Sequence, residues 1–215
     1  MNILLVHGWS YDRHLWDGVA ARLSDHRLFC VDFGYSGEPE FPDLPADEPL
    51  LAVGHSLGAL WLLTQERYAW TRLLFINGFP RFTEAPDYAP AVAPRALARM
   101  QTQLAKDPAR VLADFHARCG GPAPEGEPQL PRLSEGLRWL ADLDGRAMLA
   151  ARRDDIWAIA GADDAIVPQA MSAAAFAPLP PGRLEIANAP GHLLPLADPQ
   201  RCAALIARLA TIESS

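Results

Sequence analysis

The sequence has few cysteines, no long hydrophobic run and no excess of positive charge. The cysteines number three and are widely spaced, which excludes a CxxC pair and a disulfide framework and fits a reducing compartment. We expect Cys30, Cys119 and Cys202 to be buried structural thiols. No apolar run approaches the roughly 18 residues of a membrane-spanning helix, so we expect no association with membranes.

The start of the chain also lacks the features of a secretory leader. Met1 leads almost at once into the apolar stretch ILLVHG, without a basic region or a cleavage site, so we expect a cytoplasmic location. A net charge of −7 argues against nucleic acid as the main partner. The charge is uneven, because residues 79–153 carry 11 basic and 9 acidic side chains whereas the remainder carries 8 and 17.

Short apolar runs bounded by turn residues are the main structural signal in the chain of 215 residues. They predict buried strands at 2–6, 28–32, 50–53, 73–77, 156–161 and 183–188. Helical segments are expected between and after them, at 12–24, 57–69, 169–176 and 199–213. This alternation predicts an α/β fold with a mostly parallel sheet and helices on both faces.

Two segments interrupt the alternation. Residues 79–153 contain helical stretches at 94–105, 108–118 and 131–151 but no convincing strand. We predict that they form a helical cap inserted into a core made of residues 1–78 and 154–215. The link from Asp32 to Leu50 contains four prolines, too many for a crossover helix, and predicts an extended surface loop.

The octapeptide VGHSLGAL at 53–60 places Ser56 between Gly54 and Gly58, directly after a strand and before a helix. A catalytic nucleophile on a sharp turn needs such small neighbours, and the helix N-terminus favours developing negative charge. The alternative is a serine that only caps the helix. Catalysis needs a base and a third group that orients it, and these should follow at the ends of later strands. An acidic pair, Asp163 and Asp164, and then His192 stand at such positions.

Other histidines compete with His192 as the base. His55 adjoins the serine, where its side chain should point elsewhere, so we expect it to line or support the site. His7 follows the first strand, and His14, His26 and His116 fall in helical or surface segments where a packed or solvated imidazole is expected. The backbone N–H of Leu57 and one from the HGWS loop, that of Trp9, are the expected oxyanion donors.

These motifs together resemble the α/β-hydrolase superfamily. Those that carry the resemblance are LLVHGWS (4–10), VDFGYSG (31–37), VGHSLGAL (53–60), LLFING (73–78), IAGADDAIVP (159–168) and PGHLLPLADP (190–199). The resemblance implies Ser56 as nucleophile, His192 as base and Asp164, the residue four before Pro168, as acid. It implies no metal or organic cofactor. The superfamily usually has two strands before the HGW strand, so this chain is expected to form a trimmed version of the fold.

Within the superfamily, HGWS followed by Trp16 and the segment EGLRWLADLDGRAML (135–149) are similar to the family of pimeloyl-[acyl-carrier protein] methyl ester esterases of biotin synthesis. That resemblance implies a helical cap and an acidic acyl-carrier protein as partner. A net +2 insertion on a net −9 body would favour docking of such a partner. The docking residues expected on the cap are Arg95, Arg99, Arg110 and Arg138, with ordinary solvated helix faces as the alternative.

The function expected from these residues is hydrolysis of a carboxylic ester through an acyl-enzyme. A general short-chain carboxylesterase, a thioesterase, a C–C bond hydrolase or a menaquinone-pathway elimination could use the same triad. A non-catalytic binding protein is the rival of another class, but ligand binding alone would not require all three groups. Four aromatic residues are expected in either the pocket or the core: Trp61, Phe79, Phe82 and Trp139.

Overall fold

The computed structural model describes residues 1–45 and 47–212, and a six-stranded sheet organises them. All strand pairs are parallel, in the order β2-β1-β3-β4-β5-β6. The strands are β1 (Asn2–Val6), β2 (Arg27–Val31), β3 (Leu50–His55), β4 (Arg72–Ile76), β5 (Ile156–Asp163) and β6 (Leu184–Pro190). Each predicted strand is present, and the predicted parallel α/β architecture is confirmed.

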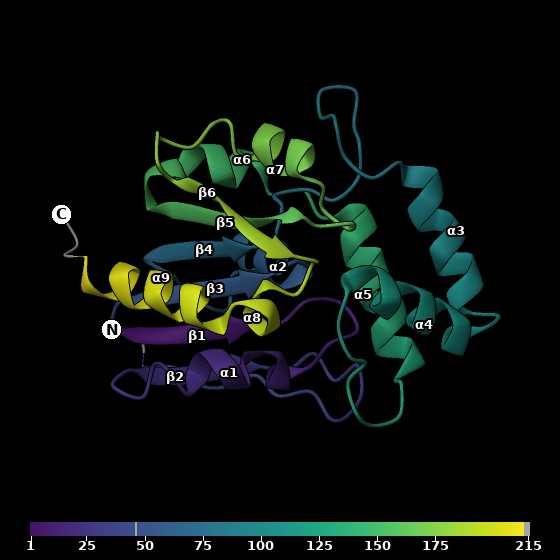
Figure 1. Ribbon diagram of the computed structural model, residues 1–215, viewed down its shortest axis with the longest axis horizontal. Coiled ribbons are helices and arrows are strands. Elements are labelled where there is room, and N and C mark those ends of the chain that lie inside the picture. Colours follow the sequence, from purple (N-terminus) through teal and green to yellow (C-terminus); the bar gives the residue numbers. More distant parts are fainter. Residues whose placement is uncertain (46, 213–215) are drawn as a thin grey trace.

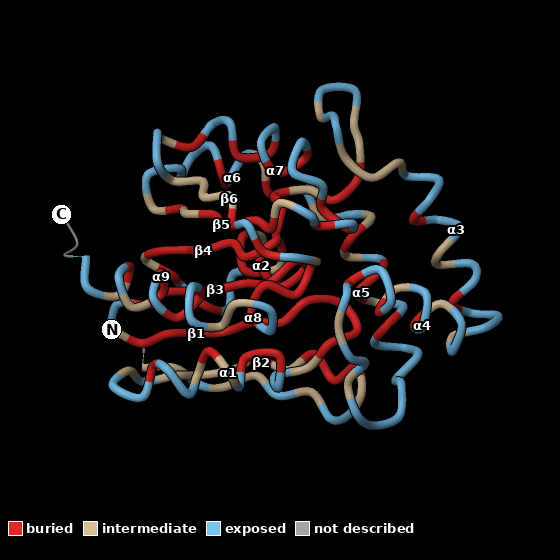
Figure 2. The backbone as a smooth tube through the Cα atoms, in the orientation of Figure 1, coloured by how far each residue is buried: buried red, intermediate tan, exposed pale blue. Residues whose placement is uncertain are grey.

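The centre of the sheet is buried from both sides. Every residue of β1, β3 and β4 is buried, which is why these strands are almost continuous apolar runs rather than alternating ones. Burial is continuous along these three strands in Figure 2, whereas the outer turns of the helices are exposed. β2 is an edge strand and is only partly buried. Because β1, β3 and β4 are adjacent and parallel, their carboxyl ends lie side by side at one edge of the sheet.

Helices cover both faces of the sheet. α1, α8 and α9 contact one another in front of the sheet in Figure 1, while α2 packs behind it on β1, β3 and β4. The helices are η1 (Arg13–Trp16), α1 (Asp17–Ala20), α2 (Leu57–Thr64), α3 (Pro94–Leu104), α4 (Pro108–Cys119), α5 (Leu130–Asp142), α6 (Arg146–Ala151), η2 (Arg153–Asp155), α7 (Gln169–Ala175), α8 (Leu194–Ala197) and α9 (Pro199–Thr211). Among the described residues, no helix is long and apolar enough to span a membrane.

The proline-rich link between β2 and β3 lies against α2 without forming a helix of its own. The Phe41 ring lies 6.0 Å from that of Trp61 on α2. Just after α2, the Tyr68 hydroxyl donates a hydrogen bond to the Pro42 carbonyl (3.0 Å). Near β2, Asp32 and Glu40 pair their backbones in both directions at 2.8 Å, which folds the link back on the strand end. In its described residues, 33–45 and 47–49, the link is thus an extended loop packed on α2 and contains no crossover helix.

Three predicted helices are shorter or divided in the structure. Only a 3₁₀ turn and the four-residue α1 form within 12–24, where Gly18 weakens helical propensity. α2 ends at Thr64 because the Gln65 side chain hydrogen-bonds the backbone of Tyr68 and competes with helix formation. The stretch 131–151 is divided into α5 and α6, with Gly145 donating its N–H to the Pro80 carbonyl (2.8 Å) at the break.

α3, α4 and α5 lie beyond the carboxyl ends of the strands, at the right of Figure 1. α5 contacts α2 as well as α3, so this helical layer rests directly on the core. α6 contacts α2 beside the sheet. The limits of the predicted cap, residues 79–153, stay a prediction.

The close approach of α2 to β1 generates a stability prediction. A Cβ added at Gly58 would lie 2.4 Å from the Val6 carbonyl oxygen and 2.5 Å from that of His7, and backbone cannot move aside cheaply. We expect Gly58→Ala to lower the free energy of unfolding by about 2 kcal/mol, as overpacking does. Gly37→Ala is the control because a Cβ there meets nothing within 4 Å. Equal stabilities in urea unfolding would contradict the close contact.

Candidate active site

Backbone strain gathers at the carboxyl edge of the sheet. Among the described residues, the non-glycine residues with positive φ are Ser10 (60°), Ser56 (52°) and Asn77 (47°). Ser56 and Asn77 directly follow β3 and β4, and Ser10 lies four residues after β1. Such conformations each cost about 1–3 kcal/mol and concentrate at functional sites. The strain therefore marks the edge where the sequence predicts the nucleophile.

Ser56 occupies a one-residue turn between β3 and α2. Its φ of 52° and ψ of −122° reverse the chain between a strand and a helix. Its N–H donates to the Ile76 carbonyl (3.0 Å), which ties the turn to β4. The turn also requires a glycine on the strand, because a Cβ at Gly54 would lie 2.3 Å from the backbone of Ala59. Close packing of helix and strand thus fixes the serine in its strained conformation.

The three side chains predicted as a triad lie in an unbroken line. The Ser56 hydroxyl donates to His192 Nε2 (2.9 Å), and His192 Nδ1–H donates to Asp164 Oδ2 (2.7 Å). All three residues are buried, with relative exposures of 5% for Ser56, 1% for His192 and 4% for Asp164. Asp163, the neighbouring acid, is exposed. The geometry is that of a nucleophile, a base and an orienting acid.

Asp164 is held by four hydrogen bonds. Its Oδ1 accepts from the backbone N–H groups of Ile166 (2.7 Å) and Val167 (2.8 Å), and Oδ2 accepts from His192 and from Asn77 Nδ2 (2.7 Å). Burial alone would raise the pKa of this carboxyl, but His192 and these donors outweigh burial and lower it. Asp164 is therefore an ionised, fixed acceptor for the imidazole.

Asn77 is a site residue that the sequence reasoning did not identify. It is completely buried, and its amide donates to the same carboxylate oxygen as His192. In the sequence, the LLFING motif indicates only that Asn77 stands at the end of an apolar strand. The sole available signal was a polar residue at the carboxyl end of β4, the strand next to the nucleophile strand.

The His55 side chain contacts the backbone of His192, and the Ser56 hydroxyl is hydrogen-bonded to His192 instead. His55 Nε2 lies 2.9 Å from the backbone carbonyl oxygen of His192, to which it donates a hydrogen bond. Burial first, and then the proximity of His192, lower the pKa of His55 to about 3, so this imidazole is neutral at pH 7. The expectation that the side chain points away from Ser56 toward a supporting role agrees with this contact.

The expected oxyanion donors lie on two sides of the nucleophile. Leu57 is the first residue of α2, where a backbone N–H has no acceptor within the helix. Among the hydrogen bonds of the described residues, none uses the backbone N–H of Trp9 or Leu57. Gly8 allows close approach, because a Cβ there would lie 2.9 Å from the Ser56 Cβ. His7 fastens the same loop, with Nδ1–H donating to the Gly8 carbonyl (2.8 Å).

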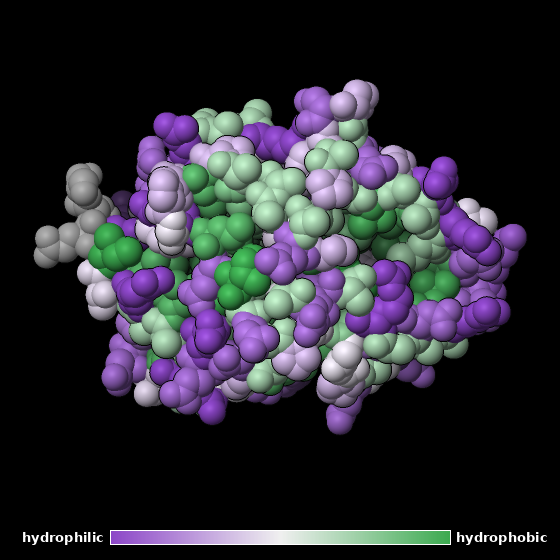
Figure 3. Space-filling view, turned by 45° about the horizontal axis from the view of Figure 1, so that its top comes forward, coloured by the Kyte–Doolittle hydropathy of each residue, from purple (hydrophilic) through white to green (hydrophobic). Residues whose placement is uncertain are grey.

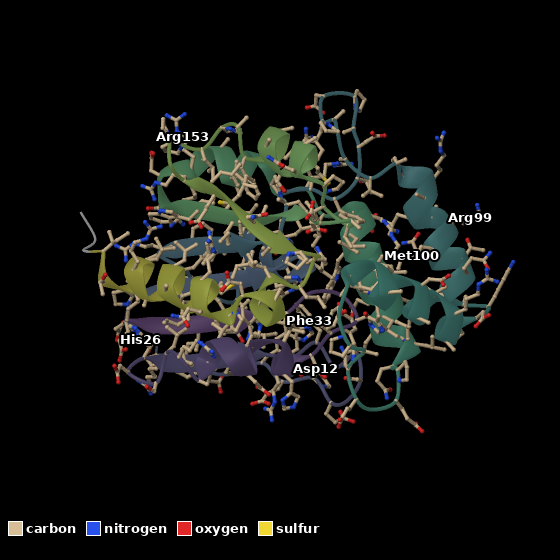
Figure 4. All side chains as sticks on the ribbon, in the orientation of Figure 1. Asp12, His26, Phe33, Arg99, Met100 and Arg153 are labelled. Atoms are coloured by element: carbon tan, nitrogen blue, oxygen red, sulfur yellow. The ribbon has the colours of Figure 1, made fainter. Side chains whose placement is uncertain are left out.

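The four predicted docking arginines are exposed, but the structure does not gather all of them in one place. Arg99 and Arg110 line a groove of about 390 Å³ between α3 and α4, with Arg118, Met100 and Phe115 as further walls. In Figure 4, Arg99 points outward from α3 while Met100 lies on the side toward α5. Figure 3 shows hydrophilic residues at this outer end of the molecule. Arg138 is on α5, 3.4 Å from Glu135, and Arg95 is the second residue of α3.

The predicted pocket aromatics fall into two clusters. Trp61 and Trp139 are half-buried, and each has its ring 5.3 Å from that of Phe33 in edge-on contact. Phe79 and Phe82 are buried and pack on each other, with ring centroids 4.7 Å apart. The first cluster joins α2, the loop after β2 and α5, so it lies where the helical layer meets the core.

The cysteines are free thiols, as expected, although Cys30 is half-buried. Burial raises the pKa of Cys119 and of Cys202 to about 12, and that of Cys30 to about 11. All three are therefore protonated and weakly nucleophilic at pH 7.

Comparison with known proteins identifies a matching family and similar relatives. The family described as "Alpha/beta hydrolase family" matches residues 3–205. The pimeloyl-[acyl-carrier protein] methyl ester esterase of Aromatoleum aromaticum is 29% identical over 242 aligned residues, which cover 95% of this chain and 96% of the relative. The enzyme of the same name from Xanthomonas campestris pv. campestris is 30% identical and covers 88% and 87%.

Solved structures share the fold at lower identity. An esterase from Exiguobacterium antarcticum superimposes with a TM-score of 0.78 at 16% identity, covering 98% of this chain and 92% of that chain. A thermophilic esterase from Thermogutta terrifontis gives a TM-score of 0.74 at 19% identity, with coverage of 98% and 89%.

His55 generates a prediction about acid stability. Its folded pKa of about 3 lies below its ordinary 6.5, so between these pH values only the unfolded chain binds this proton. Its contribution to stability is complete above pH 6.5 and is lost progressively toward pH 3. His55→Gln keeps a side-chain N–H donor but does not titrate. Between pH 7 and 5 we expect urea unfolding to show about 2 kcal/mol less loss in the variant. Equal losses would contradict a buried neutral His55.

Proposed function

The chain belongs to the α/β-hydrolase family and is a carboxylic ester hydrolase, and we propose that Ser56, His192 and Asp164 are its catalytic triad. The match to the family confirms the fold expected from the motifs. The observation that carries the triad is the buried hydrogen-bonded line from the Ser56 hydroxyl to Asp164, at 2.9 and 2.7 Å, which begins at a strained residue. His192 contacts the serine from the loop after β6, and Asp164 contacts His192 from the loop after β5.

In the proposed reaction, Ser56 Oγ attacks the ester carbonyl while His192 Nε2 accepts the hydroxyl proton. Asp164 fixes the imidazole with Nε2 unprotonated and stabilises the imidazolium that forms. The tetrahedral intermediate expels the alcohol, which takes the proton from His192, and an acyl-enzyme remains. Water, deprotonated by His192, then attacks the acyl group. The second tetrahedral intermediate expels Ser56 Oγ, which takes the proton back from His192, and the acid is released.

The negative oxygen of the tetrahedral intermediate would be bound by the N–H groups of Leu57 and Trp9. Both flank Ser56, one on α2 and one on the loop after β1. A single preorganised donor of this kind is worth roughly 10²–10³ in kcat in other hydrolases. The positive end of α2 adds favourable electrostatic potential at the same place.

For the substrate, we propose the methyl ester of a pimeloyl chain carried on an acyl-carrier protein. The support is the activity for which the relatives are named, and they align over nearly the whole chain. Hydrolysis would leave a free carboxylate on the acyl chain and release methanol. The carrier itself would stay on the protein surface.

The carrier would dock on the helical insertion. Residues 79–153 carry a net charge of +2 on a body of −9, so an acidic partner is favoured there and disfavoured elsewhere. Arg99 and Arg110 share the groove between α3 and α4 and belong to this docking proposal together with Arg95 and Arg138. A cytoplasmic location is part of the proposal, since the free thiols suit a reducing compartment.

The substrate proposal is tested by comparing esters that share the same chemistry at the carbonyl. We expect a pimeloyl methyl ester on its carrier protein to be hydrolysed with a kcat/KM at least tenfold above that of the free dimethyl ester of pimelic acid, because docking adds binding energy. Ser56→Ala should abolish both activities. Hydrolysis of the free ester alone would remove the carrier from the proposal while leaving the ester hydrolase.

The docking proposal is tested by charge reversal. Arg95→Glu with Arg99→Glu should raise KM for the carrier-bound ester about tenfold at low salt, with the difference shrinking as salt is added. KM for the free ester should not change. Arg153→Glu is the control, because Arg153 is exposed and lies at the opposite end of the molecule from α3 (Figure 4). An equal increase for both substrates, or for the control, would refute docking at α3.

A further inference from the structure

The last turn of α4 contacts three of the loops that carry proposed site groups, those of Trp9, Asp164 and His192. His116 Nε2 lies 2.8 Å from the Ser10 hydroxyl, on the loop of Trp9. The Cys119 carbonyl accepts the backbone N–H of His192 (3.0 Å). Arg118 donates to the Ala165 carbonyl (3.0 Å), directly after Asp164. One helical turn of the cap insertion is thus fastened to the oxyanion loop, the base loop and the acid loop.

Among the residues that α4 contacts, Ser10 has an unusual backbone conformation. Its φ of 60° is unfavourable for a residue with a side chain, and it directly follows Trp9, whose N–H is a proposed oxyanion donor. The nearby backbone contact from the Tyr11 N–H to the Gly8 carbonyl is long, at 3.4 Å. Within the described part of the chain, the hydrogen bond of the Ser10 hydroxyl is the one with His116. This bond therefore restrains the loop in its strained conformation.

The hydrogen bond to Ser10 comes from a buried and uncharged imidazole, that of His116. It is 8% exposed, and its ring meets Tyr11 edge-on at 5.2 Å. Burial lowers the pKa of His116, more than the contact with Ser10 raises it, so the imidazole is neutral at pH 7. Its neighbour Phe115 packs against the Trp9 ring, with centroids 4.8 Å apart. α4 therefore contacts both Trp9 and Ser10, the two residues joined by this peptide bond.

We infer that His116 is a positioning residue, which acts through Ser10 to aim the Trp9 N–H at the oxyanion and completes the oxyanion hole only while α4 lies against the loop. The inference rests on the proposed ester hydrolysis and goes beyond it, since it makes the helical insertion a part of the catalytic apparatus. Without the bond, Ser10 can relax toward negative φ, which moves the Trp9–Ser10 peptide and, through it, the backbone of Trp9 that carries the proposed donor N–H. The effect should fall on the transition state, where the oxyanion forms, and not on the bound ester.

The test uses a p-nitrophenyl ester as substrate and a trifluoromethyl ketone as inhibitor, because the ketone forms an oxyanion when the serine adds to it. His116→Ala should lower kcat about tenfold, leave KM within twofold and raise the inhibition constant of the ketone about tenfold. His116→Gln, whose amide can reach the same place as Nε2, should restore most of the loss. Ser10→Ala should reproduce His116→Ala, and the double variant should be no worse than either.

A melting temperature lowered by His116→Ala with kcat and the ketone constant unchanged would overturn the inference. Losses that multiply in the double variant would overturn it as well, because they would show that the two side chains act independently. If His116→Ala does not fold, Ser10→Ala and His116→Gln give the same comparison. Ser56→Ala separates the two claims: residual turnover in that variant refutes the proposed function, whereas its loss beside an unaffected His116→Ala refutes only the positioning role.

Discussion

The backbone of Ser56 is the constraint on which the rest of this site depends. A serine at φ 52° and ψ −122° is in an unfavourable conformation. It persists because α2 packs so closely on the sheet that the backbones of helix and strand are in contact. Gly54 and Gly58 permit that contact by having no side chain. The same turn lifts the hydroxyl above the sheet edge and starts α2 beside it. One strained residue thereby sets both the direction of the proposed nucleophile and the position of the first proposed oxyanion donor, Leu57 N–H.

Burial then determines the electrostatics around that residue. Asp164 can stay ionised in a buried place because four donors surround it, and one of these is the imidazole that it orients. His55 is kept neutral in the same environment and serves to fix the backbone of His192. A buried charge that is fully hydrogen-bonded does not need to reorganise during the reaction. The helical layer over the strand ends maintains this environment by covering the site.

The sequence predicted the sheet because buried parallel strands are short apolar runs, and it predicted the triad because each member follows a strand. It could not predict contacts between distant segments. His116 reads as an ordinary helical histidine, since its partner Ser10 lies 106 residues away. Asn77 was overlooked because its role depends on β4 lying between β3 and β5. At the division of 131–151, Gly145 donates to the Pro80 carbonyl and Arg81 pairs with Asp144, contacts between distant segments that no local pattern encodes.

The central claim is that Ser56 is a nucleophile activated by His192, and covalent labelling tests it most directly. The folded protein would be treated with a fluorophosphonate and the modified peptide identified by mass spectrometry. We predict one adduct, on Ser56, with a labelling rate that falls by at least a hundredfold in His192→Ala, since the hydroxyl then lacks a base. An adduct on another residue, or an equal rate in the variant, would contradict the account.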